Sequence, residues 1–267
     1  MQVIAHKGAN SLRIIVIKCG GSVLDELTDD FFSSLRELME NGFSPVIVHG
    51  GGPAINSMLD LFGITAQFKD GLRVTCEKTM GIVEMVLSGQ TNRQLCGMLI
   101  KNGFNALGIN GSDGDCLQGD YLDKNALGYV GTISEVNNEL IMMTIENGYI
   151  PVITPIAAAK DGFKLNINGD YAAASIAKVL KAERCAFVTN VEGILIEGEI
   201  VSDVTEQEVE GYIADGQIYG GMVPKVMSAL SAMAAGVEKV MIISGKKQFY
   251  KNNSWHGTSI AAKERVL

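Results

Sequence analysis

Metal-ligand clusters, cysteine pairs and long apolar runs are all missing from this 267-residue sequence. The three histidines (His6, His49 and His256) lie far apart and no two cysteines form a C-x-x-C pair, which excludes the usual zinc patterns. No apolar run is long enough to span a bilayer, and the first 12 residues lack the apolar core of a signal peptide. We therefore expect a soluble cytoplasmic protein that has no metal site of its own. Its dispersed cysteines should be buried free thiols: Cys19, Cys76, Cys96, Cys116 and Cys185.

Basic residues are also in the minority. The chain has 22 lysines and arginines against 30 aspartates and glutamates, a formal net charge of −8. An acidic surface repels nucleic acid and anionic membranes, so we expect neither as a partner. If the substrates are anions, the protein must create positive potential locally. Lysines and arginines in defined structural positions are therefore candidates for binding an anionic substrate.

Short apolar runs alternate with glycine turns and amphipathic stretches along most of the chain. The runs lie at residues 14–17, 45–48, 106–109, 150–153, 186–189 and 240–243. Continuous apolar strands that alternate with helices indicate an α/β fold with a parallel sheet covered on both faces. The longest predicted helix covers residues 77–102, with Met80, Val83, Val86 and Leu87 on one face, and residues 130–136 are expected to form an antiparallel insertion.

Two of the glycine turns directly follow predicted strands, at residues 18–22 (KCGGS) and 49–53 (HGGGP). Glycine lets backbone N–H groups approach an anion closely, and a helix that begins just after the turn adds partial positive charge. Neither turn matches a P-loop or a dinucleotide-binding G-x-G-x-x-G. Because ligands of open α/β sheets bind at the carboxyl ends of strands, we expect a phosphate site along that edge.

Four charged residues have both a structural and a functional interpretation. Lys18 ends a buried strand, which favours either an ion pair with a carboxylate or a bound anion. Lys225 is an ordinary solvated lysine or faces an anion at the start of a helix. Asp170 is an N-cap or a carboxylate that holds lysines in position. Arg73 taken alone favours an exposed surface arginine, and the alternative is a bidentate partner of a carboxylate.

Six segments, taken in order, resemble the amino acid kinase family. They are residues 17–22 (IKCGGS), 48–53 (VHGGGP), 71–75 (GLRVT), 166–170 (NINGD), 189–193 (TNVEG) and 220–225 (GGMVPK), and the likeness extends from about residue 13 to residue 260. The resemblance implies an open three-layer αβα sandwich with a mainly parallel sheet. It also implies an N-terminal lobe (1–175) for the amino acid and dimerisation, and a C-terminal lobe (176–267) for ATP.

The resemblance assigns roles to residues at matching positions. Lys18 and Lys225 would bind the phosphoryl oxygens, Gly21 would donate its N–H group to the phosphoryl group, and Asp170 would orient both lysines. The acidic substrate would be held by Gly51, Gly52, Arg73 and Asn166. ATP, with its Mg²⁺, would lie against Asn190, Val191, Gly193, Ile194, Leu195, Gln217, Ile218 and Tyr219.

The implied reaction is phosphorylation of the γ-carboxylate of N-acetyl-L-glutamate, because the GLRVT setting of Arg73 is typical of that branch of the family. Aspartate, free glutamate, a carrier-bound aminoadipate or a role in binding without turnover remain alternatives. Three positions depart from the family pattern: Gly169 replaces alanine, Asn190 replaces aspartate, and Tyr219 replaces a small residue. The last two bear on nucleotide affinity.

The resemblance also bears on assembly. About a dozen residues precede the first predicted strand, and residues 8–10 (GAN) would break a helix there. Because arginine-sensitive members of the family carry an N-terminal helix that links dimers into hexamers, the resemblance implies an arginine-insensitive homodimer. The binding of a PII-like protein stays open.

Overall fold

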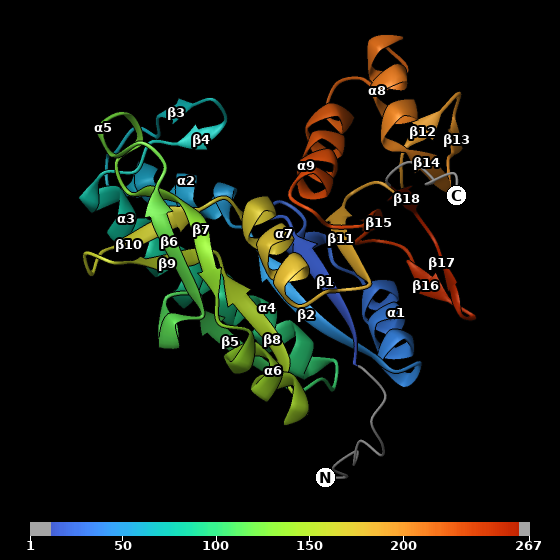
Figure 1. The fold of residues 1–267 in the computed structure, drawn as a ribbon, viewed down its shortest axis with the longest axis horizontal. Coiled ribbons are helices and arrows are strands. Elements are labelled where there is room, and N and C mark those ends of the chain that lie inside the picture. The colour runs from blue at the N-terminus through green and yellow to red at the C-terminus, as the bar shows by residue number, and fades with distance from the viewer. Residues whose placement is uncertain (1–11, 262–267) are drawn as a thin grey trace.

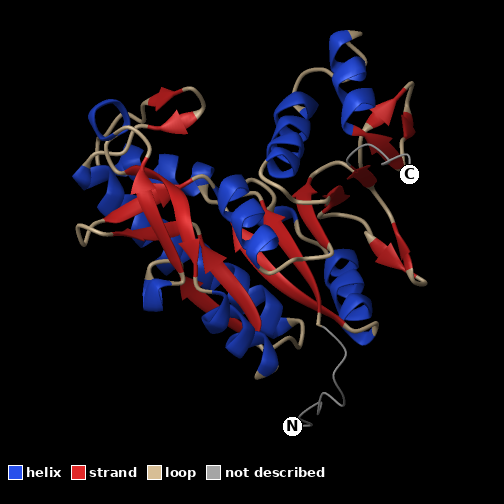
Figure 2. Ribbon diagram, viewed as in Figure 1, coloured by secondary structure: helices blue, strands red, loops and turns tan. Residues whose placement is uncertain are grey.

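The computed structural model describes residues 12–261, which form one α/β molecule with helices on both sides of a central sheet (Figures 1 and 2). The predicted helix-breaking residues 8–10 lie outside the described part of the chain. The eight strands of the sheet are, in spatial order, β14 (Asp203–Thr205), β18 (Thr258–Ala261), β15 (Lys239–Ser244), β11 (Arg184–Thr189), β1 (Arg13–Cys19), β2 (Phe43–His49), β8 (Ile150–Thr154) and β5 (Ala106–Asn110). Only the β15–β18 pair is antiparallel. The predicted mainly parallel sheet is confirmed.

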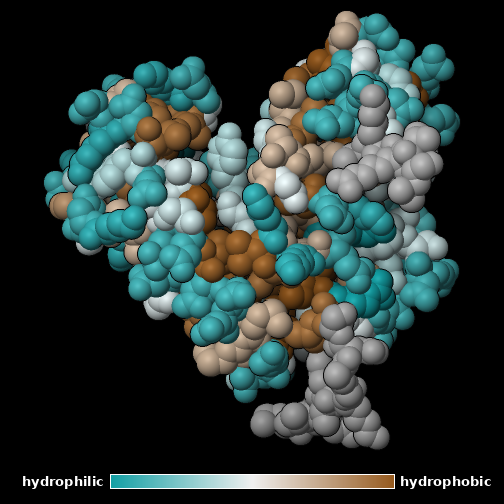
Figure 3. Space-filling view, viewed as in Figure 1, coloured by the Kyte–Doolittle hydropathy of each residue, from teal (hydrophilic) through white to brown (hydrophobic). Residues whose placement is uncertain are grey.

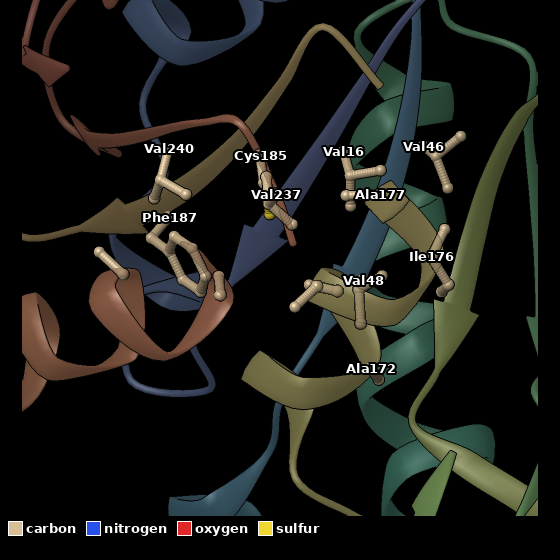
Figure 4. Close-up of a cluster of buried hydrophobic side chains, with 14 of the residues drawn as sticks. Val16, Val46, Val48, Ala172, Ile176, Ala177, Cys185, Phe187, Val237 and Val240 are labelled. Atoms are coloured by element: carbon tan, nitrogen blue, oxygen red, sulfur yellow. The ribbon is translucent and has the colours of Figure 1, made fainter. Parts of the chain in front are cut away.

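Alternate residues of the central strands enter two separate cores, as expected for a sheet covered on both faces. Val16, Val46 and Val48 pack on one face with α7 (Gly169–Val179), as Figure 4 shows. Ile15 and Ile47 pack on the other face with α1 (Asp29–Glu40) and α4 (Asn92–Lys101). The remaining helices are α2 (Gly52–Leu61), α3 (Glu77–Glu84), α5 (Lys124–Leu127), α6 (Asn138–Glu146), α8 (Glu206–Ala214) and α9 (Met222–Ala234). The three-layer αβα arrangement is therefore confirmed.

The long helix predicted at residues 77–102 is present as one continuous helical stretch. It consists of α3, a π-helical turn (Met85–Thr91) and α4. The four apolar side chains predicted to share a face are all buried, and they pack with Ile55 and Leu59 of α2. π-Helical turns are rare, occur mostly as single turns inside α-helices, and are frequent at functional sites. Here the turn lies beside the second glycine turn, as the site geometry below shows.

A small closed barrel of four strands contains the segment that was predicted as an antiparallel insertion. Its strands are β10 (Lys164–Ile167), β7 (Val130–Val136), β6 (Leu117–Tyr121) and β9 (Ile156–Ala159). β7 pairs antiparallel with β6 but parallel with β10, so the prediction was correct for one of its two neighbours. Three two-stranded hairpins complete the fold: β3 (Phe68–Lys69) with β4 (Leu72–Arg73), β12 (Leu195–Ile196) with β13 (Glu199–Ile200), and β16 (Tyr250–Lys251) with β17 (Ser254–Trp255).

The structure corrects the prediction for one cysteine and decides which residue caps α7. Cys76 is exposed, because it stands at the N-cap of α3 rather than in a core, whereas the other four cysteines are buried. The N-cap of α7 is Asn168, whose side-chain oxygen accepts from the N–H groups of Asp170 and Tyr171. Asp170 therefore lies in the first turn of the helix, and its carboxylate is free of the capping role.

Within residues 12–261, no helix is long and apolar enough to cross a membrane.

Candidate active site

The carboxyl ends of four neighbouring strands bring the glycine turns together at one edge of the sheet. Cys19 is in register with His49 on one side and Val188 on the other, and Thr189 is in register with Ser244. The turns that follow β1, β2 and β11 therefore begin side by side. Above them a cleft separates the part that carries α2 and the β3–β4 hairpin from the part that carries α8 and α9 (Figures 1 and 3). This is the edge where the sequence predicted the site.

The first two glycine turns touch each other through their backbones. A Cβ atom on Gly21 would lie 2.7 Å from the nitrogen of Gly51 and 3.0 Å from that of Gly52. A Cβ atom on Gly51 would lie 2.5 Å from Cδ2 of Leu87, on the π-helical turn. At Gly21 a larger residue would collide with backbone atoms, so this glycine permits a close approach of the two turns. Three amide nitrogens are thereby gathered at the base of the cleft.

Lys18 and Asp170 form an ion pair across the end of β1 and the start of α7. Their nitrogen and oxygen are 2.7 Å apart, and the side chains are 17% and 23% exposed. The other carboxylate oxygen of Asp170 accepts a hydrogen bond of 2.7 Å from the hydroxyl of Ser228 on α9. The structure is thus compatible with both interpretations of Lys18. The ion pair with Asp170 fits the structural one, and the position at the cleft fits the binding of an anion. A lysine held by one carboxylate keeps further N–H donors for a second anion.

Lys225 lies on α9, three residues before Ser228, and it donates a hydrogen bond to the side-chain oxygen of Asn190. Burial lowers the pKa of Lys225, and the nearby carboxylate of Glu26 partly opposes this shift. The expectation that Asp170 orients both lysines needs refinement. Asp170 contacts Lys18 directly, but it reaches the second lysine only through Ser228 and the helix that both residues share. Ser228 was missed by sequence reasoning, because the partner of its hydroxyl, Asp170, lies 58 residues away in the chain.

Arg73 is buried rather than exposed, with only 8% of its surface accessible. One guanidinium nitrogen donates to the carbonyl oxygen of Gly52 at 3.4 Å, and the group lies 4.8 Å above the ring of Phe68. Its Nη1 is buried without a hydrogen-bond partner among the described residues. A buried cationic donor without a partner is costly, so this atom points to an anionic ligand.

Asn166 is linked to Arg73 through Thr75. The Asn166 amide donates to the hydroxyl of Thr75 at 3.1 Å, and that hydroxyl donates to the carbonyl oxygen of Arg73 at 2.7 Å. The two residues predicted to hold the ends of an amino-acid substrate therefore belong to one hydrogen-bonded unit. Because Thr75 is completely buried, this unit is held firmly.

The predicted nucleotide residues divide into two groups. Ile194 and Ile218 are buried in the core, so only their backbone atoms could serve a nucleotide, and Gly193 packs against Thr258 without room for a side chain. The side chains of Asn190, Leu195, Gln217 and Tyr219 are exposed, and Val191 is half-buried. Tyr219 is 76% exposed. A nucleotide could therefore contact these exposed residues without any change in the core.

Two further features concern charge and protonation. Residues 12–261 contain no group of three or more histidine, cysteine, aspartate or glutamate side chains that could hold a metal ion. His49, which sequence reasoning left without a role, is completely buried beneath the second glycine turn, and burial lowers its pKa to about 4.

Comparison with known proteins agrees with this geometry. The sequence matches the amino acid kinase family over residues 13–244. It is 48% identical over 248 residues to the acetylglutamate kinase of Geobacillus kaustophilus (strain HTA426), covering 93% of this chain and 96% of that protein. The crystal structure of smu.665 from Streptococcus mutans UA159 is 35% identical, with a TM-score of 0.81, and the match covers 94% of this chain and 99% of that one. Carbamate kinase from Giardia lamblia bound to AMP-PNP shares the fold at 16% identity, with a TM-score of 0.64 and coverage of 94% and 99%. From its sequence match and its fold alike, the chain belongs to the amino acid kinase family.

Proposed function

We propose that this protein transfers the γ-phosphoryl group of ATP to the γ-carboxylate of N-acetyl-L-glutamate, a step of arginine biosynthesis. The product is an acyl phosphate, N-acetyl-L-glutamyl 5-phosphate. The name of the 48%-identical relative supports this acceptor. The structural observation that carries the proposal is Nη1 of Arg73, which is buried and has no hydrogen-bond partner among the described residues, while Nη2 of the same guanidinium donates to the carbonyl oxygen of Gly52. Such a free, buried cationic donor suits the α-carboxylate of an amino acid.

The mechanism that fits this site relies on position and charge. A carboxylate attacks in its ionised form, so it needs no general base, and the neutral His49 is too deeply buried to serve as one. The obstacle is repulsion between the attacking anion and the phosphates. Lys18, Lys225 and the amides of Gly21, Gly51 and Gly52 would neutralise the oxygens of the group in transfer.

ATP and its magnesium ion belong to the same proposal. The metal would neutralise charge on the nucleotide phosphates, and it would be held mainly by their oxygens. We place the amino acid in residues 1–175 and the nucleotide in residues 176–267. The boundary falls within α7, which packs against β1 and β2 and also against β11 and α9. α7 would therefore join the two binding regions.

An acyl-phosphate assay tests the function directly. The purified chain is incubated with ATP, Mg²⁺ and one of four acceptors: N-acetyl-L-glutamate, L-glutamate, L-aspartate or N-acetyl-L-aspartate. Hydroxylamine then traps any acyl phosphate as a hydroxamate. We expect product with N-acetyl-L-glutamate at a kcat/KM at least tenfold above every other acceptor. A higher value for another acceptor would reassign the substrate, and nucleotide binding without product would indicate a binding module.

Arg73→Ala is expected to raise the KM for N-acetyl-L-glutamate by about tenfold or more, because a charged hydrogen bond to a buried guanidinium contributes about 1.5–3 kcal/mol. The change in kcat should be smaller. Steady-state kinetics with saturating ATP measure both constants. Arg36→Ala, at an exposed arginine of α1, is the matched control. If kcat fell while KM stayed constant, Arg73 would belong to the chemical step.

The proposed homodimer would use the outer edge of β5. Among the described residues β5 pairs only with β8, so its other edge is open. Leu107 on that strand is 43% exposed, and Ile100 on the adjoining helix α4 is 58% exposed. An open apolar edge strand favours pairing with a second copy.

Leu107→Glu is therefore expected to convert a dimer into a monomer, because two like charges would face each other across the two-fold axis. Light scattering coupled to size exclusion measures the mass. Leu195→Glu, at an exposed leucine of the β12–β13 hairpin, is the matched control and should stay dimeric. A dimer that survived Leu107→Glu would place the interface elsewhere.

A further inference from the structure

His49 closes β2 directly below the second glycine turn, and every hydrogen-bonding atom of its ring has a partner. Its Nδ1 lies 3.1 Å from the carbonyl oxygen of Gly50. Its Nε2 lies 3.1 Å from the side-chain nitrogen of Asn92 and 3.2 Å from the hydroxyl of Thr154. The side chains of His49, Asn92 and Thr154 are completely buried. These three residues come from β2, α4 and β8, so they connect the glycine turn to the sheet and to the long helix.

The partners determine which ring nitrogen carries the proton. A carbonyl oxygen can only accept, so Nδ1 must donate to Gly50. A buried neutral ring then has an unprotonated Nε2, which accepts from the amide of Asn92. The orientation of that amide is itself set, because its nitrogen also donates to the carbonyl oxygen of Val152 at 2.8 Å and its oxygen accepts from Arg93. These contacts all fit the tautomer that carries its proton on Nδ1.

The hydrogen bond to Gly50 also orients the next amide. In a trans peptide the C=O of one residue and the N–H of the next point in opposite directions. The described residues contain no cis peptide bond. With the Gly50 carbonyl turned toward the His49 ring, the N–H of Gly51 points away from the ring. The nitrogen of Gly51 is one of those that crowd Gly21 at the base of the cleft.

We propose that His49 is a positioning residue, which holds the Gly50–Gly51 peptide plane so that the Gly51 N–H faces the group in transfer. The inference rests on the proposed kinase function for its catalytic consequence. A run of three glycines has little conformational preference of its own, so an unheld peptide plane could rotate. A fixed donor spares the reorganisation that a mobile one would need during the reaction.

Two variants of similar size separate this role from simple core packing. Asparagine carries its amide nitrogen at the same branch point as Nδ1, so His49→Asn can still donate to Gly50. Glutamine carries its amide one atom further out, at the level of Nε2, so His49→Gln keeps contact with Asn92 but loses the bond to Gly50. We expect kcat to fall by about tenfold or more in His49→Gln and by less than about threefold in His49→Asn. Both KM values should stay within about twofold.

The kinetics of the two variants can overturn the proposal in two ways. A His49→Gln enzyme as fast as the unmodified protein, or a His49→Asn enzyme as slow as His49→Gln, would overturn the proposal. ¹⁵N NMR of the histidine-labelled, unmodified protein gives a second test that needs no variant. The ring that stays neutral down to pH 5 should be protonated on Nδ1, and protonation on Nε2 would also overturn the proposal. If the unmodified protein formed no acyl phosphate, the proposed function would fail while the NMR test still decided the tautomer.

Discussion

Lys18→Ala and Lys225→Ala are each expected to lower kcat by about a hundredfold or more, with a smaller change in the KM for N-acetyl-L-glutamate. Each lysine stands at the cleft edge, and each is held by one neighbour, Asp170 or Asn190. A fixed donor to charge that develops in the transition state is worth about 3 kcal/mol, which corresponds to this factor. Initial rates in the hydroxamate assay, with each substrate varied in turn, measure both constants.

The matched control is Lys239→Ala. Lys239 is an exposed lysine at the amino end of β15, at the far edge of the same sheet, so its loss changes net charge without touching the cleft. Its kcat should match that of the unmodified protein. Near-normal turnover in Lys18→Ala or Lys225→Ala would remove that lysine from the proposed mechanism. Circular dichroism of each variant establishes that the loss of rate does not come from unfolding.

Acidification from pH 6.5 to about pH 4 is expected to lower the free energy of unfolding by about 3 kcal/mol through His49 alone. Burial lowers the pKa of this ring in the folded state from 6.5 to about 4. Between these values the unfolded chain binds a proton that the folded protein does not. Stability therefore rises with pH by about 1.4 kcal/mol per unit within this window and is unaffected by His49 above it.

Urea unfolding at half-unit steps between pH 7 and pH 4.5 measures this slope. His49→Asn is the control, because it has no titratable ring at the same position, and its stability should depend much less on pH in this window. The exposed carboxylates of Asp161 and Glu208 also have lowered pKa values, owing to hydrogen bonds, but they lose their charge at lower pH. Equal slopes for the two proteins would show that the ring is charged or accessible in the folded state.

Residues that are close together in the sequence predicted the type of sheet, the edge that carries the candidate site and one buried helix face. Apolar runs such as residues 45–48 have to be buried on both faces, so they predicted a parallel sheet. Glycines 20–21 and 50–52, placed just after such runs, predicted a site at the carboxyl edge, and the structure brings these turns into contact. The four apolar positions of the 77–102 stretch predicted its buried face correctly. Each of these inferences depends on residues that are close together in the sequence.

Contacts between distant segments could not be predicted in the same way. Whether Arg73 was exposed depended on Phe68 and Gly52, and the interpretation from the residue alone favoured the surface. The N-cap of α7 is Asn168 rather than Asp170, so the Asp170 carboxylate is available to bind Lys18 and Ser228. His49 looked like an isolated histidine until Asn92 and Thr154, 43 and 105 residues away, were placed against its ring.

The amino-acid sequence by itself determined the layered α/β architecture, the edge that carries the site and the residue types available there. It did so because burial and backbone freedom are local properties of a chain. Only the tertiary structure decided which carboxylate holds which lysine, which guanidinium nitrogen has no partner among the described residues, and which histidine nitrogen carries the proton. These depend on the distance and direction between groups from different elements, and such relations exist only once the sheet and its helices are packed together.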